Sequence, residues 1–474
     1  MAVALALMGD AFMYAVLPSH TVAFGVPLAA VGLLLSANRW IRLLTNPFAG
    51  WAFERWGRPR PFAAAVALAV VTTGTYGAGT GVAVLLAARV LWGVCWSFLR
   101  LGVYLAAMEA APPARGRLIG LSWGVVRFGS LIGLLGGGYL ADRLGHRAAA
   151  LFLAGATTLG IAVAWPAVRA ARTGRSPTAK AGALFHEGAP DGGENADHSG
   201  DCGARCGTVG HGRNGTGKGS RAGGRGNEGG GGRSDQRPAS ADAGIGGPVA
   251  AAHRETPRDR GGTPGETPPA RLGAVAYAAL VKSLVVEGLV GATLGRLLID
   301  RFGGGVPLAG QTLGVATVTG ALLALNDGVG LALGASVGHQ VDRLGRRHVL
   351  RVAALAAAAA LAGLALARSL PLIAVSVAAL WVAGVALNVS LAAAAGDVGG
   401  AGSMSRVMSR FATWVDIGAA SGPLLGYLAV AKFGFPLPYL VGVLVLVSVT
   451  AISPWVPAGQ WSAHRRERPA RAAR

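Results

Sequence analysis

Long apolar runs constrain the fold of this chain more than any other feature of its sequence. One run covers residues 350–367 and another covers 437–456. A helix needs about 20 predominantly apolar residues to cross the hydrocarbon core of a bilayer, and both runs approach or reach that length. Of the 474 residues, 52% are hydrophobic and only 14% are charged, whereas soluble domains carry roughly 25% charged residues. The chain is therefore expected to be a membrane protein.

Windows of high hydrophobicity predict an all-α polytopic membrane protein with 12 transmembrane helices, six in each half. The segment 1–19 is interpreted as a spanning helix and not as a cleaved signal, because no basic residue precedes it and Asp10 interrupts it. The twelve expected helices lie near 1–19, 27–50, 61–79, 81–107, 118–139, 148–168, 272–298, 309–337, 349–367, 370–396, 403–429 and 436–457.

The composition divides the chain into four parts. Two six-helix bundles are expected over 1–170 and 271–458, with a basic tail over 459–474. Between the bundles, 171–270 is rich in Gly, Pro and Arg and lacks the apolar residues of a core, so it is expected to be a disordered linker. From residue 172 to 270 there are 13 basic and 11 acidic residues, so its near balance of charge argues against binding to nucleic acid.

The distribution of Lys and Arg over the short loops predicts the orientation in the membrane. Eleven of them lie after the second, fourth, eighth and tenth helices, and five lie in the loops on the other side. Because positive loops stay in the cytoplasm, we expect both termini and the linker there. The expected location is the cytoplasmic (inner) membrane of a prokaryote, with multiple passes.

A short sequence motif that begins with glycine occurs four times along the chain. Similar glycine-led segments begin at Gly50, Gly138, Gly338 and Gly426, and the spacing within each half is 88 residues (138 − 50 and 426 − 338). Each half is therefore interpreted as a duplicated three-helix unit. An odd number of helices inverts the second copy, and nested inverted repeats are typical of alternating-access transporters.

These segments carry a family resemblance. The stretches GWAFERWGRPRP from Gly50 and GHQVDRLGRRHVL from Gly338 resemble the loop signature of the major facilitator superfamily, with Glu54 in place of its Asp and Pro59 in place of a basic residue. LLAARVLWG over 85–93 resembles its fourth-helix motif, and GSLIGLLGGG over 129–138 is similar to the fifth-helix signature of drug–proton antiporters without its proline. The resemblance implies two pseudo-symmetric six-helix bundles, each built from two inverted three-helix repeats.

In that superfamily the loop signature acts as a cytoplasmic latch between the halves. The resemblance implies that glycines allow tight turns and that the charged residues bridge neighbouring helices. An alternative is that these charges only anchor loops and set the topology. The residues assigned to the latch are Gly50, Glu54, Arg55, Gly57, Arg58, Gly338, Asp342, Arg343, Gly345 and Arg346.

A charge precedes each repeated glycine by 10 or 11 residues: Arg39, Arg127, Asp327 and Asp416. At 1.5 Å per residue, each lies ~15–16 Å from a membrane face, which is the midplane of a core ~30 Å thick. Because the superfamily fold brings the second helix to the eleventh and the fifth to the eighth, we expect two ion pairs between the halves, Arg39–Asp416 and Arg127–Asp327. Protonation of either Asp would loosen the interface; a static pair, or a charge that faces a water-filled cavity, is the alternative.

The resemblance also implies which helices line the transport cavity, namely the first, fourth, seventh and tenth. On these helices Asp10, Arg89 and Glu287 are the candidates for contact with substrate or proton, with Trp92 and Trp96 as aromatic lining. The same aromatic side chains are also common in helix packing.

The sequence favours a secondary active transporter that works by alternating access and is coupled to protons, with export of amphiphilic compounds. Two alternatives are uptake or exchange of an organic anion or metabolite, because several Arg lie in the first half, and a transporter-like receptor or scaffold. No nucleophile–base pair or metal-ligand cluster is found in a credible context, so we expect no enzyme activity, no metal and no cofactor. The expected partners are a small-molecule substrate, the proton as coupling ion and the lipid bilayer, with no nucleic acid, and we expect a monomer.

Overall fold

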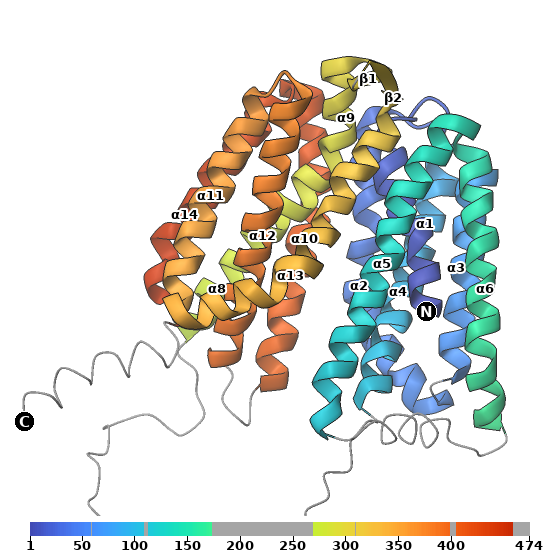
Figure 1. The fold of residues 1–474 in the computed structure, drawn as a ribbon. Coiled ribbons are helices and arrows are strands. Elements are labelled where there is room, and N and C mark those ends of the chain that lie inside the picture. The colour runs from blue at the N-terminus through green and yellow to red at the C-terminus, as the bar shows by residue number, and fades with distance from the viewer. Residues whose placement is uncertain (58, 109–111, 173–268, 309, 399–403, 458–474) are drawn as a thin grey trace, which may run out of the picture. The chain divides into compact units, whose positions relative to one another are not determined.

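The apolar segments form helices that run back and forth through two bundles (Figure 1). All described residues belong to one compact unit. The computed structural model describes every residue except 58, 109–111, 173–268, 309, 399–403 and 458–474. The expected linker over 171–270 and basic tail over 459–474 therefore fall almost entirely outside the described residues, and the latch residue Arg58 does so as well.

The first bundle contains six antiparallel helices. They are α1 (Ala2–Val16), α2 (Leu28–Trp56), α3 (Pro59–Ala78), α4 (Val82–Met108), α5 (Pro112–Leu144) and α6 (His146–Arg172).

The second bundle begins with a span of three consecutive helical segments and continues with five α-helices and a short 3-10 helix. Its elements are α8 (Pro269–Lys282), the π-helix η1 (Ser283–Val290), α9 (Gly291–Phe302), α10 (Val315–Leu344), α11 (Arg346–Leu366), α12 (Leu370–Val398), α13 (Met404–Phe433), α14 (Pro436–Ile452) and the short 3-10 helix η2 (Ser453–Trp455).

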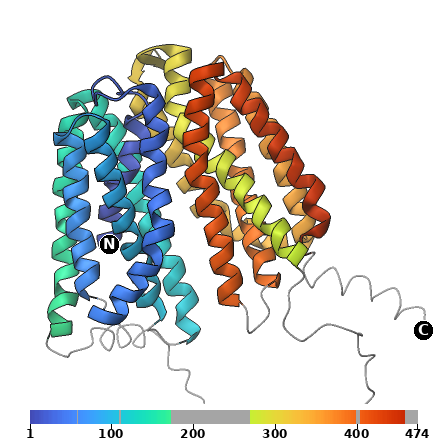
Figure 2. The same ribbon diagram turned by 180° about the vertical axis from the view of Figure 1, so that it is seen from behind.

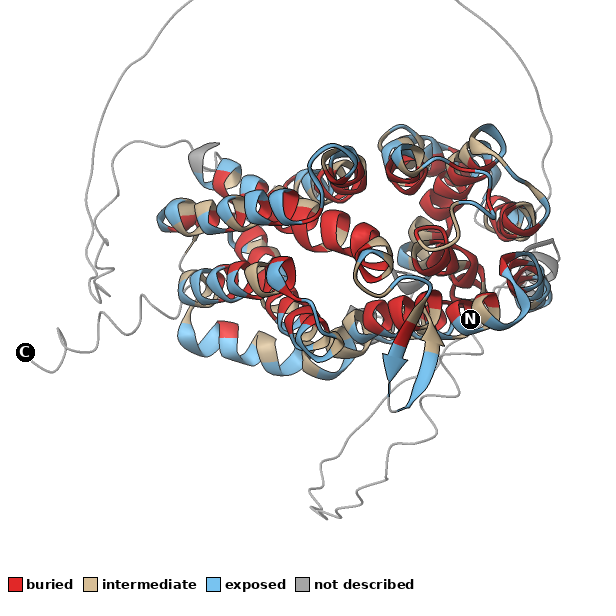
Figure 3. Ribbon diagram, turned by 90° about the horizontal axis from the view of Figure 1, so that it is seen from above, coloured by how far each residue is buried: buried red, intermediate tan, exposed pale blue. Residues whose placement is uncertain are grey.

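Eleven helical segments of the described chain are long and apolar enough to cross a membrane, and α1, with 15 residues, is a shorter apolar helix. Figure 3 shows buried residues on the sides of the helices that face the middle of each bundle and exposed residues on the outside. Many exposed residues are large and apolar, for example Leu44 at 74% and Leu444 at 71%. An apolar exterior suits hydrocarbon, so the chain is a multi-pass membrane protein.

The predicted number and order of spanning segments is confirmed, but several boundaries differ. The helices α2 and α10 continue to Trp56 and Leu344, so Glu54 and Asp342 are helical residues and not loop residues as expected. The helix expected from residue 309 begins only at Val315. The residues before it form two antiparallel strands, β1 (Gly305–Leu308) and β2 (Gln311–Gly314), which turn at Gly310 with a positive φ of 80°.

The four repeats end their helices in the same way. A glycine with positive φ follows the last helical residue in each copy, a conformation that other L-residues rarely adopt. Each of these glycines lies 18 residues after the central charge of its own copy (57 − 39, 145 − 127, 345 − 327 and 434 − 416). The four glycines are Gly57, Gly145, Gly345 and Gly434.

The two bundles meet closely only toward one end. We call the end that holds β1 and β2 the hairpin end, and the end where α6 stops and α8 begins the linker end (Figure 1). Between α5 and α10, a Cβ added at Gly138 would lie 2.4 Å from the carbonyl oxygen of Ala316. Between α2 and α13, which adjoin on the face shown in Figure 2, a Cβ at Gly32 would lie 2.6 Å from the carbonyl oxygen of Pro423. Small residues thus allow backbone contact there.

The same helices are separated toward the linker end. Gly50 on α2 and Gly338 on α10 would have no neighbour within 4 Å of an added Cβ. Close backbone contact between the bundles is therefore found toward the hairpin end and not at Gly50 or Gly338.

Packing within the first bundle yields a testable prediction from two glycines on α5. A Cβ at Gly133 would lie 2.5 Å from the carbonyl oxygen of Met8 on α1, whereas a Cβ at Gly136 would meet nothing within 4 Å. Gly133→Ala is expected to lower the free energy of unfolding by about 1–3 kcal/mol because α1 and α5 must move apart. Thermal unfolding of the purified protein, followed by tryptophan fluorescence, measures the effect. Gly136→Ala is the matched control, and equal melting temperatures for the two variants would contradict this packing.

Candidate functional site: a charged cavity between the bundles

A cavity of about 350 Å³ lies between the two bundles, near the middle of the helices. Helices of both bundles line it, and its wall combines charged and aromatic side chains with apolar ones. The polar and aromatic lining residues are Asp10, Tyr14, Arg39, Arg42, Trp96, Trp123, Arg127, Ser130, Glu287, Asn326, Asp327 and Trp381. Of the sequence candidates, Asp10, Glu287 and Trp96 line this cavity, as do three of the four central charges.

Asp10 is held by residues behind the cavity wall. Its Oδ1 accepts a hydrogen bond from Nδ2 of Asn38 at 3.0 Å and forms an ion pair with the guanidinium of Arg89. Arg89 is completely buried, and its Nε also donates to the carbonyl oxygen of Leu34 at 3.1 Å. Arg89 therefore contacts Asp10 and does not line the cavity. Trp92, also completely buried, packs behind the wall, so the structure places neither of these two expected contact residues at the cavity surface.

Glu287 owes its position to the π-helix η1. Five residues cover about 1.4 turns of an α-helix, which would turn Lys282 and Glu287 to different faces. In a π-helix, whose hydrogen bonds run from residue i to i+5, five residues are close to one turn. Here Nζ of Lys282 donates to Oε1 of Glu287 at 2.5 Å and to Oδ1 of Asn388 at 3.1 Å. The other oxygen of Glu287 lies 3.9 Å from Arg39.

One central ion pair joins the two bundles at the edge of the cavity. Arg127 on α5 donates to Oδ1 of Asp327 on α10 at 3.0 Å. The side chain of Asp327 is 14% exposed and that of Arg127 is 43% exposed. Both residues line the cavity, so the pair is in reach of water and of a bound molecule.

The expected Arg39–Asp416 pair is not formed in this conformation. Asp416 lies 3.4 Å from Arg100 on α4, while Nε of Arg39 donates to the hydroxyl of Tyr14 at 3.2 Å. The reason is the axial register of the helices. The backbone NH of Leu424 on α13 donates to Ser36 on α2, and from this bond Arg39 is three residues away along α2 whereas Asp416 is eight residues away along α13. The two charges are thus about 7.5 Å apart along the helix axes.

The latch residues near the linker end make no contact between bundles in the described structure. Arg346 forms an ion pair with Asp397 and donates to the carbonyl oxygen of Ala393 at 2.9 Å, all within the second bundle. Glu54 and Asp342 are exposed, and neither has an ion pair among the described residues. The proposed latch role stays a prediction. It concerns a conformation in which the two bundles meet at the linker end.

A contact of latch type does exist at the hairpin end, in the second copy of the repeat. Oδ2 of Asp142 on α5 accepts hydrogen bonds from the backbone NH and from Oγ1 of Thr317, each at 2.6 Å. Thr317 lies in the first turn of α10, where the NH groups have no partner within the helix. The carboxylate of one bundle therefore caps the N-terminus of a helix in the other bundle. This role of Asp142 could not be predicted from the family signature, because that signature covers only the segments that begin at Gly50 and Gly338.

Several lining residues were not among the candidates predicted from the sequence. Trp123, Asn326 and Trp381 line the cavity, but nothing in their spacing distinguishes them from packing residues. Arg42 follows Arg39 by three residues and therefore shares its helix face, so this signal was present in the sequence.

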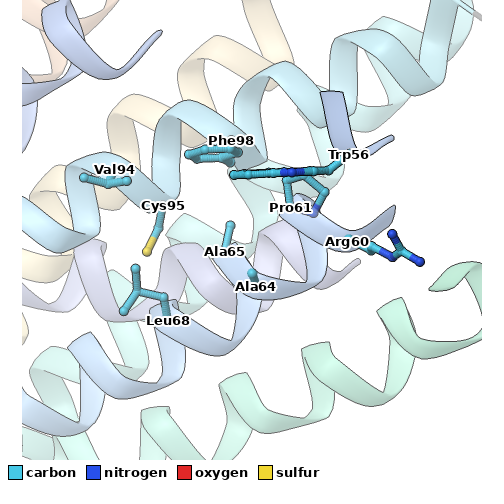
Figure 4. A pocket seen from close by; sticks show the side chains of 9 residues that line it. All are labelled: Trp56, Arg60, Pro61, Ala64, Ala65, Leu68, Val94, Cys95 and Phe98. Carbon is cyan, nitrogen blue, oxygen red and sulfur yellow. The ribbon is translucent and has the colours of Figure 1, made fainter. Parts of the chain in front are cut away.

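A second pocket, of about 320 Å³, lies between α3 and α4 near the linker end (Figure 4). Its wall is almost entirely apolar, with Trp56, Phe98 and Leu68 around it and Arg60 at its rim. It offers no polar group for a charged substrate beyond Arg60. Among the described residues, no group of three or more His, Cys, Asp or Glu is placed to hold a metal ion.

Comparison with known proteins connects this architecture to membrane carriers. Residues 1–192 match the family model described as Major Facilitator Superfamily. The synaptic vesicular amine transporters of Homo sapiens and Rattus norvegicus are each 33% identical over 136 residues, which is 28% of this chain and 26% of theirs. The chain thus matches about a quarter of the length of these curated relatives.

Solved structures share the fold over nearly the whole chain. The human organic anion transporter MFSD10 (TETRAN) gives a TM-score of 0.54 at 15% identity, with 95% of this chain and 97% of that chain covered. A mutant of the nucleoside transporter NupG gives a TM-score of 0.62 at 10% identity, with 96% of this chain and 98% of that chain covered. A bacterial homolog of the human lysosomal transporter Spinster, in an inward-facing and occupied conformation, gives 0.59 at 13% identity, with 96% and 94% covered.

Two bundles of helices around a central cavity are an architecture typical of secondary transporters. The match to the major facilitator superfamily covers residues 1–192 of this chain, and the comparisons leave a subfamily unresolved.

The bond from Asp142 to α10 predicts how the hairpin end opens. Asp142→Ala leaves the first turn of α10 without its acceptors, so the closed hairpin end is expected to open more often. A cysteine introduced at Ser130, which lines the cavity, reports this opening through its labelling by a membrane-impermeant maleimide added from the hairpin side. We expect labelling to become several-fold faster. Asp300→Ala, at an exposed acid of the same end, is the control, and unchanged labelling in the Asp142 variant would show that the cap does not hold the bundles together.

The pair between Arg127 and Asp327 predicts a charge-swap result. Arg127→Asp and Asp327→Arg each place like charges together, so each is expected to lower the melting temperature and to reduce transport. The double swap is expected to restore both, with a coupling energy of about 1–3 kcal/mol in a double-mutant cycle. Arg127→Asp combined with Asp416→Arg is the mismatched control, which should not recover. A true swap that recovers no better than this control would argue against the pair.

Proposed function

We propose that this protein is a proton-coupled secondary transporter that exports amphiphilic small molecules by alternating access. The observation that carries the proposal is the ion pair between Arg127 and Asp327, which joins the two bundles and lines the cavity at the same time. A group at that place responds both to what occupies the cavity and to how the bundles are arranged.

The difference between the two ends supports alternating access. Backbone contacts at Gly32 and Gly138 close the hairpin end, while the glycines of the family signature at the linker end have no neighbours. Rocking of the bundles around the cavity would exchange these two arrangements. In the orientation expected from the loop charges, the linker end faces the cytoplasm, so the cavity loads from the inside, as export requires.

Asp327 is our candidate for the coupling proton. Its carboxylate faces Arg127, and Glu287 and Asn326 line the same cavity. When Asp327 is ionised, it attracts Arg127 and stabilises the contact between α5 and α10. When it is protonated, that attraction is lost and Arg127 is left without its partner, which favours separation of the two helices.

The lining supports an amphiphilic substrate. Four aromatic side chains (Tyr14, Trp96, Trp123 and Trp381) face the cavity together with charged groups, so one molecule can stack on a ring and meet a charge. The name of the vesicular relatives suggests an amine, but their match covers only 136 residues.

Transport of an organic anion is a second candidate, favoured by the charges of the cavity. Five basic residues, but only three acidic ones, line the cavity or pair with a lining residue. The basic residues are Arg39, Arg42, Arg89, Arg127 and Lys282, and the acidic ones are Asp10, Glu287 and Asp327.

Proton flux tests the proposal. The full-length protein is reconstituted into liposomes loaded with a pH-sensitive dye, a pH gradient is imposed, and amphiphilic cations and then organic anions are added. We expect one class to collapse the gradient in the wild type. Asp327→Asn should retain exchange of radiolabelled substrate but lose the proton signal, because the residue can no longer change its charge.

Asp300→Asn, outside the cavity, serves as the control and should behave as the wild type. A full proton signal in Asp327→Asn would exclude this residue as the coupling site. Exchange of substrate without any proton movement in the wild type would refute proton coupling itself.

A further inference from the structure

Arg42 is the exception among the cations of the cavity. It is the central residue of α2, only 7% exposed, and it lines the cavity. Its Nε is buried without a hydrogen-bond partner, and its guanidinium makes no hydrogen bond or ion pair with the described residues. Its guanidinium lies over the face of Trp96, whose ring centroid is 5.5 Å from Cζ. A buried cation without a partner is costly in a membrane protein, so it indicates a function.

The neighbouring acids do not serve Arg42 as direct partners. Asp10 and Asp416 attract it from a longer distance, and Arg39 repels it. Asp10 is bound to Arg89 and Asn38, and Asp416 lies against Arg100. Both carboxylates are therefore committed to other side chains in this conformation.

The remaining acids of the cavity are occupied in the same way. Glu287 has Lys282 at 2.5 Å, and Asp327 has Arg127 at 3.0 Å. An ammonium group that enters the cavity must displace a cation from one of these pairs. A carboxylate that enters finds Arg42 with its donors unused.

We propose that Arg42 and the indole of Trp96 form the subsite that binds the carboxylate end of an amphiphilic substrate. This inference rests on the proposed transport function and names its substrate class as aryl or alkyl carboxylates. A guanidinium binds a carboxylate through two parallel hydrogen bonds. The ring of Trp96 lies against the guanidinium in a cation–π contact, and the ring of Trp123, 6.2 Å from that of Trp96, extends an aromatic wall for the apolar part of the molecule.

Binding to purified full-length protein tests the subsite. The probes are a series of aryl carboxylates from benzoate to naphthoate and naphthylacetate, with naphthamide and naphthylmethylamine as uncharged and cationic counterparts. Quenching of tryptophan fluorescence gives the dissociation constants. We expect the wild type to prefer the carboxylates and Arg42→Gln to weaken their binding about 10- to 100-fold, with the amide and amine unaffected. Arg60→Gln, at the rim of the apolar pocket, is the matched control.

A stability measurement separates a substrate subsite from a structural role. If Arg42 lacks a partner in the ligand-free protein, Arg42→Met should leave the melting temperature unchanged or raise it, whereas Arg127→Met, which breaks an ion pair, should lower it. Arg42→Lys keeps the positive charge but cannot donate two parallel hydrogen bonds to one carboxylate. This variant should therefore bind carboxylates with intermediate affinity.

Three outcomes overturn the proposal: carboxylates that bind equally well to Arg42→Gln, an Arg42→Met variant that is clearly destabilised, or a wild type that binds no carboxylate of the series. None of these outcomes bears on proton-coupled export of other amphiphiles. That function fails only if the liposomes show no coupled flux.

Discussion

The arrangement of the central helices depends on the need of each embedded charge for a partner. An ionised group in the hydrocarbon core is costly unless it is paired or hydrated. Asp10, Glu287, Asp327 and Asp416 each lie against a basic side chain of another helix or another helical segment. Two of these contacts, Arg127–Asp327 and Arg100–Asp416, also join the two bundles. Attraction between charges therefore holds the middle of the molecule, where the cavity lies.

At the hairpin end, close contact between backbones holds the two bundles together. Glycines remove the side chains that would keep α2 from α13 and α5 from α10, and Asp142 caps α10 across the interface. Toward the linker end, Gly50 and Gly338 have no close neighbour, and the described signature residues form no ion pair with the other bundle. A midpoint held by charges and close backbone contact at one end fit the proposed rocking mechanism, in which one set of contacts breaks while the other forms.

The structure also explains why the ion-pair partners of the central charges were harder to predict than their depth along the helices. The depth of the four central charges followed from counting residues, since each lies 18 residues before the glycine that ends its helix. The partner of Asp416 did not follow, because antiparallel helices slide along each other and a shift of about 7.5 Å brings it to Arg100 and not to Arg39. The contact of Lys282 with Glu287 depends on a π-helix, which the hydrophobic pattern does not indicate.

The sequence by itself determined the twelve spanning segments, the inverted repeats and the presence of charges at mid-depth, because length and local composition decide whether a helix can cross a bilayer and where it ends. The tertiary structure alone decided which side chains face the cavity, which carboxylate meets which cation, and that Arg42 lies over Trp96 without an ion pair to the described residues. These features depend on the rotation and sliding of helices far apart in the chain. They are set by packing and electrostatics between bundles, which no local pattern records.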